Sequence, residues 1–240
     1  MLEPAKSEYR NMVVDGTPVR VYTAGDEDVA PLRINPFELA PNDKLHSHVD
    51  ALAAIINAAF PMEGPMSALV EQGLLKAYEK SGWDVSLGIP PDDGRIPTMN
   101  EFYAALKETV DEQNFQGDYG CNIKSALLTR IRSLCIGPRG RLFNSETEFD
   151  VEDLLSTPTV VEIKRLGNDE TKTFLSGVLL LRIYKYFEDC GESEGYPAAG
   201  APVPPHGTPG NGDPGTDGGC IKDEDSEVRT PWEEKPGVGT

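Results

Sequence analysis

A short apolar segment followed by a long amphipathic one, near residue 160, most strongly limits the fold of this chain. After Pro158, residues 159–163 include three β-branched apolar side chains, which suit a strand buried partly or wholly within a sheet. From Asp169, apolar residues recur at helical spacing through Tyr184, and we predict a helix over about 169–188. A strand that leads into a crossover helix is typical of a parallel sheet, so we expect an α/β fold.

Upstream of this unit, two strand-like segments precede a long helical region. Residues 19–22 alternate and predict a short strand, and 32–37 read as extended because Pro36 keeps the preceding residue out of a helix. Apolar residues then recur every three or four positions, which predicts helices over about 43–60, 65–81 and 122–135. A further helix should begin at Thr98, because Thr98 and Glu101 fit a capping box. Four helices therefore separate two strand regions.

Residues 191–240 differ in composition from the rest. They are rich in Gly, Pro, Asp and Glu and contain almost no Ile, Leu or Phe. Ordering the backbone costs about 1–2 kcal/mol per residue, and such a segment has too little apolar area to offset that cost. We therefore expect 191–240 to be a disordered acidic tail.

The net charge limits the class of partner. The chain has 22 Lys and Arg against 40 Asp and Glu, a charge of −18; residues 191–240, with three basic and ten acidic side chains, hold −7 of it and the body −11. An acidic body argues against a dedicated nucleic-acid-binding module, but leaves room for a local basic patch. The first residues lack a signal-peptide core and no run approaches the ~20 apolar residues of a membrane span, so we expect a cytoplasmic chain without a membrane partner.

Metal, disulfide and hydrolase signatures are not found. His46 and His48 lie two apart, which on a helix points them to different faces, and we expect solvated side chains rather than metal ligands. The four cysteines are widely spaced, and we expect buried thiols at these positions: Cys121, Cys135, Cys190 and Cys220. No Ser/His/Asp or Cys/His nucleophile arrangement stands out, so we assign no catalytic residue.

Nucleotide-binding signatures are also missing. The sequence contains no Gly-x-x-x-x-Gly-Lys-[Ser/Thr] loop to hold phosphates and no apolar strand ending in Asp-Glu to hold Mg²⁺. We therefore expect the isolated chain to bind no cofactor.

Four arginines concentrate positive charge in this acidic chain. They are Arg130, Arg132, Arg139 and Arg141. One reading is an exposed helix face and turn. The other is contact with DNA phosphates or with a neighbouring subunit's nucleotide, because guanidinium binds phosphate through two parallel hydrogen bonds.

Several motifs in one order resemble bacterial HerA-like ATP-binding proteins, of the HerA/FtsK group of RecA-like motors. In the first half these are Glu3-Pro4-Ala5-Lys6-Ser7-Glu8-Tyr9-Arg10, Pro31-Leu32-Arg33-Ile34-Asn35-Pro36-Phe37-Glu38, Ala59-Phe60-Pro61-Met62, Gly64-Pro65-Met66, Tyr78 and Gly82-Trp83-Asp84. In the second half they are Arg130-x-Arg132-Ser133-Leu134, Gly137-x-x-Gly140, Pro158-Thr159-Val160-Val161-Glu162-Ile163, Leu166 and Lys172-x-Phe174-Leu175. The resemblance covers about residues 1–188.

The resemblance implies a RecA-like core with an inserted helical region, assembled as a ring that couples ATP hydrolysis to movement of double-stranded DNA. It divides the chain before the tail over 191–240 into a partial core over 1–42, a helical insertion over 43–140 and a return to the core over 141–190. It also places Glu3, Lys6 and Glu8 near the nucleotide. ATP and Mg²⁺ are implied for the complete family domain.

The family's phosphate loop would precede Glu3, and its acidic strand would follow the helix over 169–188. We expect a fragment of such a motor that is inactive alone. It is either a gene fragment or a subunit completed by another ATPase chain or by a homo-oligomeric ring, with DNA as the expected partner. The alternative is a non-enzymatic interaction protein that keeps the helical region and the acidic tail.

Overall fold

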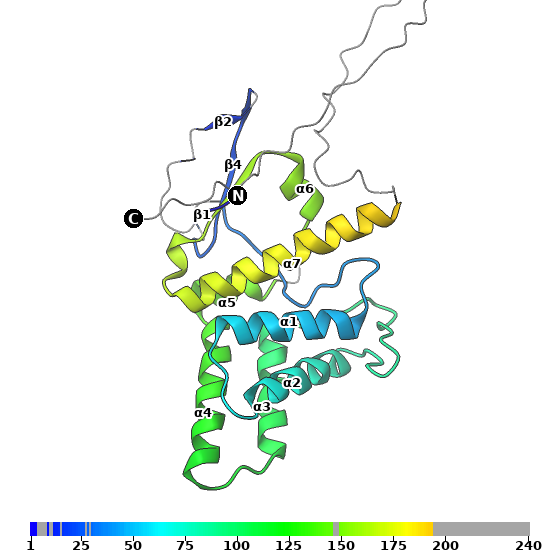
Figure 1. Cartoon of the computed structure of the whole chain (residues 1–240), viewed down its shortest axis with the longest axis vertical. Coiled ribbons are helices and arrows are strands. Elements are labelled where there is room, and N and C mark those ends of the chain that lie inside the picture. Colours follow the sequence, from blue (N-terminus) through cyan, green and yellow to red (C-terminus); the bar gives the residue numbers. More distant parts are fainter. Residues whose placement is uncertain are drawn as a thin grey trace, which may run out of the picture. The chain divides into compact units, whose positions relative to one another are not determined.

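A small parallel sheet joins segments that are far apart in the chain. The computed structural model describes residues 1–3, 9, 12–14, 16–26, 28, 30–145 and 149–193, all within the unit Met1–Tyr196 (Figure 1). The strands β1 (Leu2–Glu3), β5 (Thr159–Glu162) and β4 (Arg20–Thr23) pair in that order, both pairs parallel. The expected mixed α/β fold with a parallel sheet is therefore confirmed.

The central strand β5 is the most deeply buried of the three. Val160, Val161 and Ile163, the β-branched residues that predicted it, are all buried. β4 lies within one residue of the predicted strand over 19–22. A second pairing, the antiparallel hairpin of β2 (Val13–Val14) and β3 (Thr17–Pro18), was not predicted because two residues per strand are too few to show alternation.

Three of the predicted helices match closely. They are α1 (Leu45–Ala59), α2 (Met66–Lys80) and α3 (Met99–Glu112). The capping box is formed as predicted, since the Thr98 side chain accepts from the Glu101 backbone and the Glu101 carboxylate accepts from the Thr98 N–H. The next helix, α4 (Gly117–Leu134), begins five residues before the predicted start, because its first turns carry few apolar residues.

Two short helices were missed. α5 (Gly137–Phe143) occupies the segment around Gly137–Gly140 that was expected to be a turn, and α6 (Val151–Ser156) precedes β5. Neither is long enough to show a helical repeat. α6 is instead fixed by its start, where the Asp150 side chain accepts a hydrogen bond from the Asp153 N–H at 2.9 Å.

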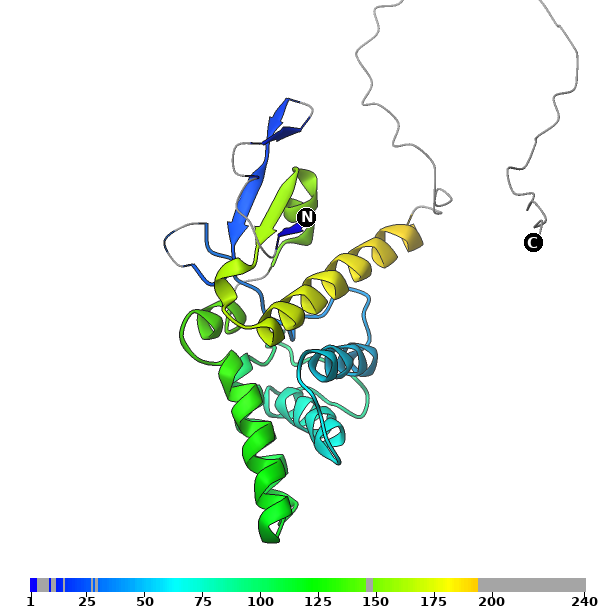
Figure 2. The same ribbon diagram turned by 60° about the vertical axis from the view of Figure 1, so that its left-hand side comes forward.

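The longest helix, α7 (Asp169–Ser193), links the sheet to the other helices. It packs against α1 and α6, and in both views it runs between the strands and the group α1–α4 (Figures 1 and 2). Phe174 is fully buried, with its ring 5.1 Å from that of Phe143 in α5. α7 continues five residues past the predicted end at 188. The tail predicted to be disordered, apart from helical 191–193, lies outside the described residues.

A buried polar network holds the segment before α1 in place. Arg182 in α7 forms an ion pair with Glu38 at 2.6 Å, and the Tyr78 hydroxyl donates to the Phe37 carbonyl at 2.5 Å. His48 is 2% exposed, with its Nε2 3.1 Å from the Pro36 carbonyl oxygen. The expectation of a solvated His48 is therefore wrong, whereas His46 is exposed as expected.

Candidate functional site at the carboxyl edge of the sheet

Three polar side chains form a row where the parallel strands end. Glu3 of β1 is the register partner of Glu162 of β5, and Glu162 is in turn the partner of Thr23 of β4. All three are buried, with exposed fractions of 7%, 3% and 1%. The Thr23 hydroxyl lies 3.5 Å from a Glu162 carboxylate oxygen, to which it donates. Two carboxylates and a hydroxyl are thus brought side by side by strand pairing.

The turns after β4 and β5 are joined beside this row. The Ala24 N–H donates to the Glu162 carbonyl at 2.9 Å, which extends the pairing by one residue. Beyond it, Asp26 forms an ion pair with Arg165 at 2.6 Å. Asp26 is buried whereas Arg165 is exposed, so the guanidinium covers the carboxylate on its solvent side.

The start of α7 adds buried polar atoms close in sequence to the end of β5. The Thr171 hydroxyl and the Asn168 side-chain oxygen are buried and have no hydrogen-bond partner among the described residues. Thr171 lies in the first turn of α7 and Asn168 directly precedes it, at a helix start where N–H groups also lack partners within the helix. Polar atoms left unpaired in this way are uncommon in protein interiors.

This edge is the part of the fold where a ligand would be expected. In open α/β sheets, ligands bind outside the carboxyl ends of the strands. Buried carboxylates favour a cation or hydrogen-bond donors close by, because an uncompensated buried charge is costly. However, the described residues include no group of three or more His, Cys, Asp or Glu that could hold a metal ion, so the pair of carboxylates offers Mg²⁺ only part of a ligand set.

Of the three residues assigned to the nucleotide by resemblance, only Glu3 can be placed. It lies in the row with Glu162 and Thr23. Lys6 and Glu8 lie outside the described residues. Glu162 and Thr23 were not singled out from the sequence, although a glutamate within an otherwise apolar strand was a usable signal.

The four arginines divide between two consecutive helices. On α4, the Arg130 guanidinium lies 3.2 Å from the Met66 sulfur, and that of Arg132 lies 5.8 Å from the centre of the Tyr103 ring. Both therefore contribute to packing between α4 and its neighbours. On α5, Arg139 is half-buried and Arg141 is exposed.

Arg141 lines a polar cleft of about 520 Å³ that the sequence did not reveal. The other lining residues come from the segment before α1, from the start of α3 and from the α4–α5 region: Arg33, Asn100, Cys135, Gly137, Gly140, Asn144 and Ser145. Arg33 and Arg141 are far apart in the chain, so local spacing could not predict that they share a cleft.

The cysteines are less buried than predicted. Cys121 and Cys190 are exposed and Cys135 is half-buried, so the expectation of buried thiols is wrong for the first two. Cys220 lies outside the described residues. Cys121 and Cys190 are exposed because they occupy outward positions of α4 and α7. The spacing of the cysteines in the sequence did not indicate these positions.

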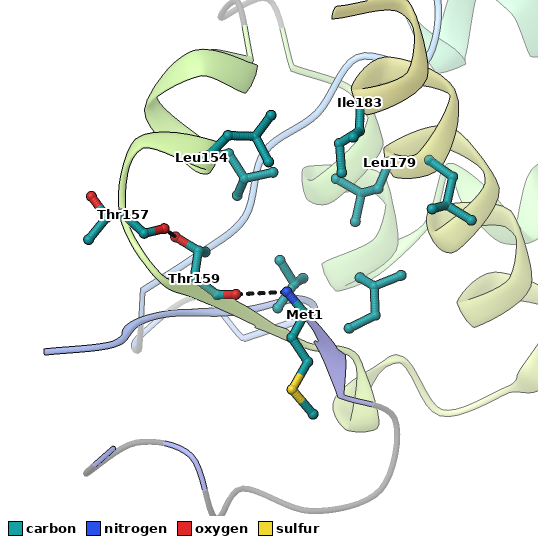
Figure 3. A pocket seen from close by; sticks show the side chains of 10 residues that line it. Met1, Leu154, Thr157, Thr159, Leu179 and Ile183 are labelled. Carbon is teal, nitrogen blue, oxygen red and sulfur yellow. Dashed lines mark hydrogen bonds between the residues drawn. The ribbon is translucent and has the colours of Figure 1, made fainter. Parts of the chain in front are cut away.

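An apolar cavity of about 370 Å³ lies between the sheet, α6 and α7 (Figure 3). Leu154, Leu179 and Ile183 line it from the helices, and Met1 and Thr159 from the strands, where the Met1 amino group donates to the Thr159 carbonyl at 2.8 Å. Apart from the Met1 amino group and the hydroxyls of Thr157 and Thr159, its described lining is apolar and includes no Asp, Glu, His, Lys, Arg, Ser or Cys side chain. We therefore assign the candidate site to the carboxyl edge and not to this cavity.

No protein-family model and no curated protein matches this chain. Within the described part of the chain, none of the helices combines the length and apolar character needed to cross a membrane.

Proposed function

We propose that this chain forms the central part of a subunit of a HerA-like, ATP-driven DNA translocase. In this proposal 1–42 and 141–190 belong to a RecA-like core, 43–140 to an inserted helical region and 191–240 to an acidic tail. The observation that carries it is the parallel pairing of β4 with β5, although helices α1–α6 lie between them in the chain. An α/β core interrupted by a helical region is what the ordered motifs imply.

In this proposal the nucleotide binds near the carboxylate row, which is formed by Glu3, Glu162 and Thr23 at the carboxyl ends of the strands. Glu3 carries the resemblance to a segment near the nucleotide, and it lies beside the buried Glu162. Neither residue can replace a phosphate loop, which binds phosphate through backbone N–H groups and a lysine. ATP and Mg²⁺ would therefore bind only when sequence carrying that loop and the acidic strand completes the site.

The proposal predicts that the isolated chain does not hydrolyse ATP. It also predicts that the chain does so when combined with the missing parts of the motor. The experiment is to read the DNA on both sides of the coding region, co-express the flanking frames with this chain and measure DNA-stimulated ATP hydrolysis. Loss of the loop or of the metal anchor normally reduces the rate by orders of magnitude, so the contrast should be large. Glu162→Gln should lower the restored rate, whereas Glu79→Gln, on the exposed face of α2, should not.

Two results would contradict the proposal. One is that the flanking frames encode neither the glycine loop nor the acidic strand. The other is that the assembled proteins hydrolyse ATP at the same rate with Glu162→Gln as with the unmodified chain, which would place the carboxylate row away from the nucleotide.

A second candidate function is a non-enzymatic interaction protein. It is favoured by the charge of −18 and by the absence of a phosphate loop from the 240 residues. Here the helical region is the docking surface and 191–240 a solubilising or DNA-mimicking arm. The test is co-purification of partners with the full chain and with a chain lacking 191–240; recovery of no stable protein partner in either case excludes it.

A further inference from the structure

The apolar cavity between the sheet, α6 and α7 departs from the packing that is usual inside proteins. Protein interiors contain few voids larger than a water molecule, whereas this cavity has a volume of about 370 Å³. Sites for small molecules typically measure ~300–1,000 Å³ and are lined mostly by apolar side chains. The size and the lining of the cavity therefore match a site for a small ligand.

The lining of the cavity changes from buried side chains at its base to exposed ones at its mouth. Leu154 of α6, Val161 of β5 and Leu179 of α7 line the base, and each is at most 6% exposed. Figure 3 shows Leu154 and Leu179 on opposite sides of the cavity. Leu155 and Leu180 also line it but are 39% and 59% exposed. A molecule that enters therefore passes an apolar rim and is then removed from water.

Hydrogen bonds to β4 hold α6 in place as one wall of the cavity. Arg20 of β4 forms an ion pair with Asp153 of α6 and also donates to the Thr157 hydroxyl at 2.6 Å. α6 in turn packs against α7, which forms the opposite wall. The walls are joined to each other by contacts within the chain, so a ligand does not have to order them on binding, and the entropic cost of binding is reduced.

The hydroxyls and the amino group of the lining already have hydrogen-bond partners. The Thr159 hydroxyl donates to the Thr157 carbonyl at 2.9 Å, and the Thr157 hydroxyl accepts from Arg20. The Met1 amino group donates to the Thr159 carbonyl at 2.8 Å. The described lining residues carry no charged side chain, and a charged group that leaves water without a partner is costly to bury. The lining therefore favours a neutral ligand.

We propose that this cavity binds a neutral, apolar small molecule, with a hydrocarbon chain or an aromatic ring system as the buried part. A cavity of about 150 Å³ with apolar walls is already enough to bind benzene. A molecule bound here contacts β5, α6 and α7 together, so it stabilises their arrangement. The residues of the carboxylate row are not among the described lining residues, and the inference does not depend on the chain being part of a motor.

The test is a titration of the full chain with N-phenyl-1-naphthylamine, a neutral dye whose fluorescence rises in apolar surroundings, followed by displacement with 1-octanol or octanoate. We expect saturable binding of the dye and stronger displacement by the neutral alcohol than by the charged acid. Leu155→Trp, which places a larger side chain at the rim, should weaken dye binding by about tenfold, because each buried CH₂ equivalent contributes roughly a fourfold factor. The matched control is Leu87→Trp, since Leu87 is 71% exposed and lies outside the lining.

A second measurement needs no substitution. 1-Octanol added to the unmodified chain should shift the methyl NMR signals of Leu154, Leu179 and Ile183, which line the cavity. Methyl shifts confined to other parts of the chain would overturn the proposal, even if Leu155→Trp does not fold.

Dye binding that Leu155→Trp weakens and Leu87→Trp keeps supports the site. The proposal is overturned if the unmodified chain shows no saturable binding, or if both substitutions weaken binding equally. Displacement by octanoate as strong as that by 1-octanol contradicts a neutral ligand. Sedimentation velocity gives a further outcome: a dimer that Leu155→Trp converts to monomers would show that a second copy of the chain covers the cavity, which also overturns the proposal.

Discussion

In the interior, an ion pair joins two residues that are far apart in the chain, Arg182 and Glu38. Arg182 donates to the Glu38 carboxylate at 2.6 Å and to the Glu38 carbonyl at 2.9 Å, and it reaches the Phe149 carbonyl at 3.3 Å. Burying such charges is costly unless they are paired, so a pair of this kind contributes mainly by defining one arrangement of its segments. Here the segments are the end of the extended stretch before α1, the segment just before α6, which contains Phe149, and α7.

We predict that Arg182→Ala lowers the free energy of unfolding by about 3–5 kcal/mol, because it leaves the buried Glu38 carboxylate without its guanidinium partner. The measurement is equilibrium unfolding in urea. The comparison is Lys80→Ala, which removes the exposed ion pair with Glu108 and should cause a much smaller change. Equal effects of the two substitutions would show that the Arg182 pair is not needed for the fold.

Gly140→Ala tests the close approach between α4 and α5. The added Cβ would overlap the Cys135 carbonyl oxygen, a backbone atom that cannot rotate away. We therefore expect the free energy of unfolding to fall by about 2 kcal/mol or more. Gly137→Asn is the control, because no atom lies within 4 Å of the new Cβ and asparagine tolerates the left-handed conformation. Thermal unfolding of both variants would distinguish a packing constraint from a general intolerance of the motif.

At the level of elements, α1 and α7 are joined by charges as well as by apolar packing. Asp43, just before α1, contacts Lys185 of α7 at 3.2 Å and His48 of α1 at 3.6 Å. Burial raises the pKa of the Asp43 carboxyl, but the contacts with His48 and Lys185 outweigh burial, so the pKa lies below its ordinary value of 3.8. The start of α1 therefore carries a carboxylate whose ionised form the fold stabilises.

This shift predicts a pH dependence. A carboxyl whose pKa is lower in the folded than in the unfolded state contributes stability above the unfolded-state pKa, and the contribution is lost as the pH falls through the folded-state pKa. We therefore expect the free energy of unfolding to fall below about pH 4, and to fall less in Asp43→Asn. Urea unfolding at neutral pH and at several acidic pH values measures this, with Asp50→Asn as the matched control; an unchanged pH dependence in Asp43→Asn would contradict it.

The helices differ in how well the sequence predicted them. The bounds of α1 and α2 were predicted within two residues and the start of α3 within one, because each helix presents one apolar face and has a clear stop or cap. The two short helices α5 and α6 were missed, because their stability comes from tight packing at Gly140 and a cap at Asp150 rather than from a repeating pattern. The carboxylate row was predicted only at Glu3, and through resemblance alone.

At the level of the whole molecule, the apolar core ends well before the C-terminal segment. The buried apolar side chains of the described residues run from Ala24 to Leu179, and the compact unit is Met1–Tyr196. Both the sheet and the helical region depend on α7, which contributes Phe174 and Leu175 to the core.

We therefore predict that a chain ending at residue 196 unfolds at the same urea midpoint as the full chain. A chain ending at residue 168, which lacks α7, should not fold cooperatively, because the apolar surfaces of α1 and the sheet would lose their cover. Circular dichroism during denaturation measures both. A lower midpoint on removal of 197–240 would show that this segment stabilises the core.

The sequence alone determined the α/β class, the central strand, the long helices and the ordered motifs that resemble HerA-like proteins. These features depend on the spacing of neighbouring residues, which is read directly from the chain. Only the tertiary structure placed Glu3 beside Glu162 and Thr23, brought Arg33 to Arg141 and buried His48. Each of these arrangements is made by pairing or packing between distant segments, and local periodicity does not encode which distant segments will meet.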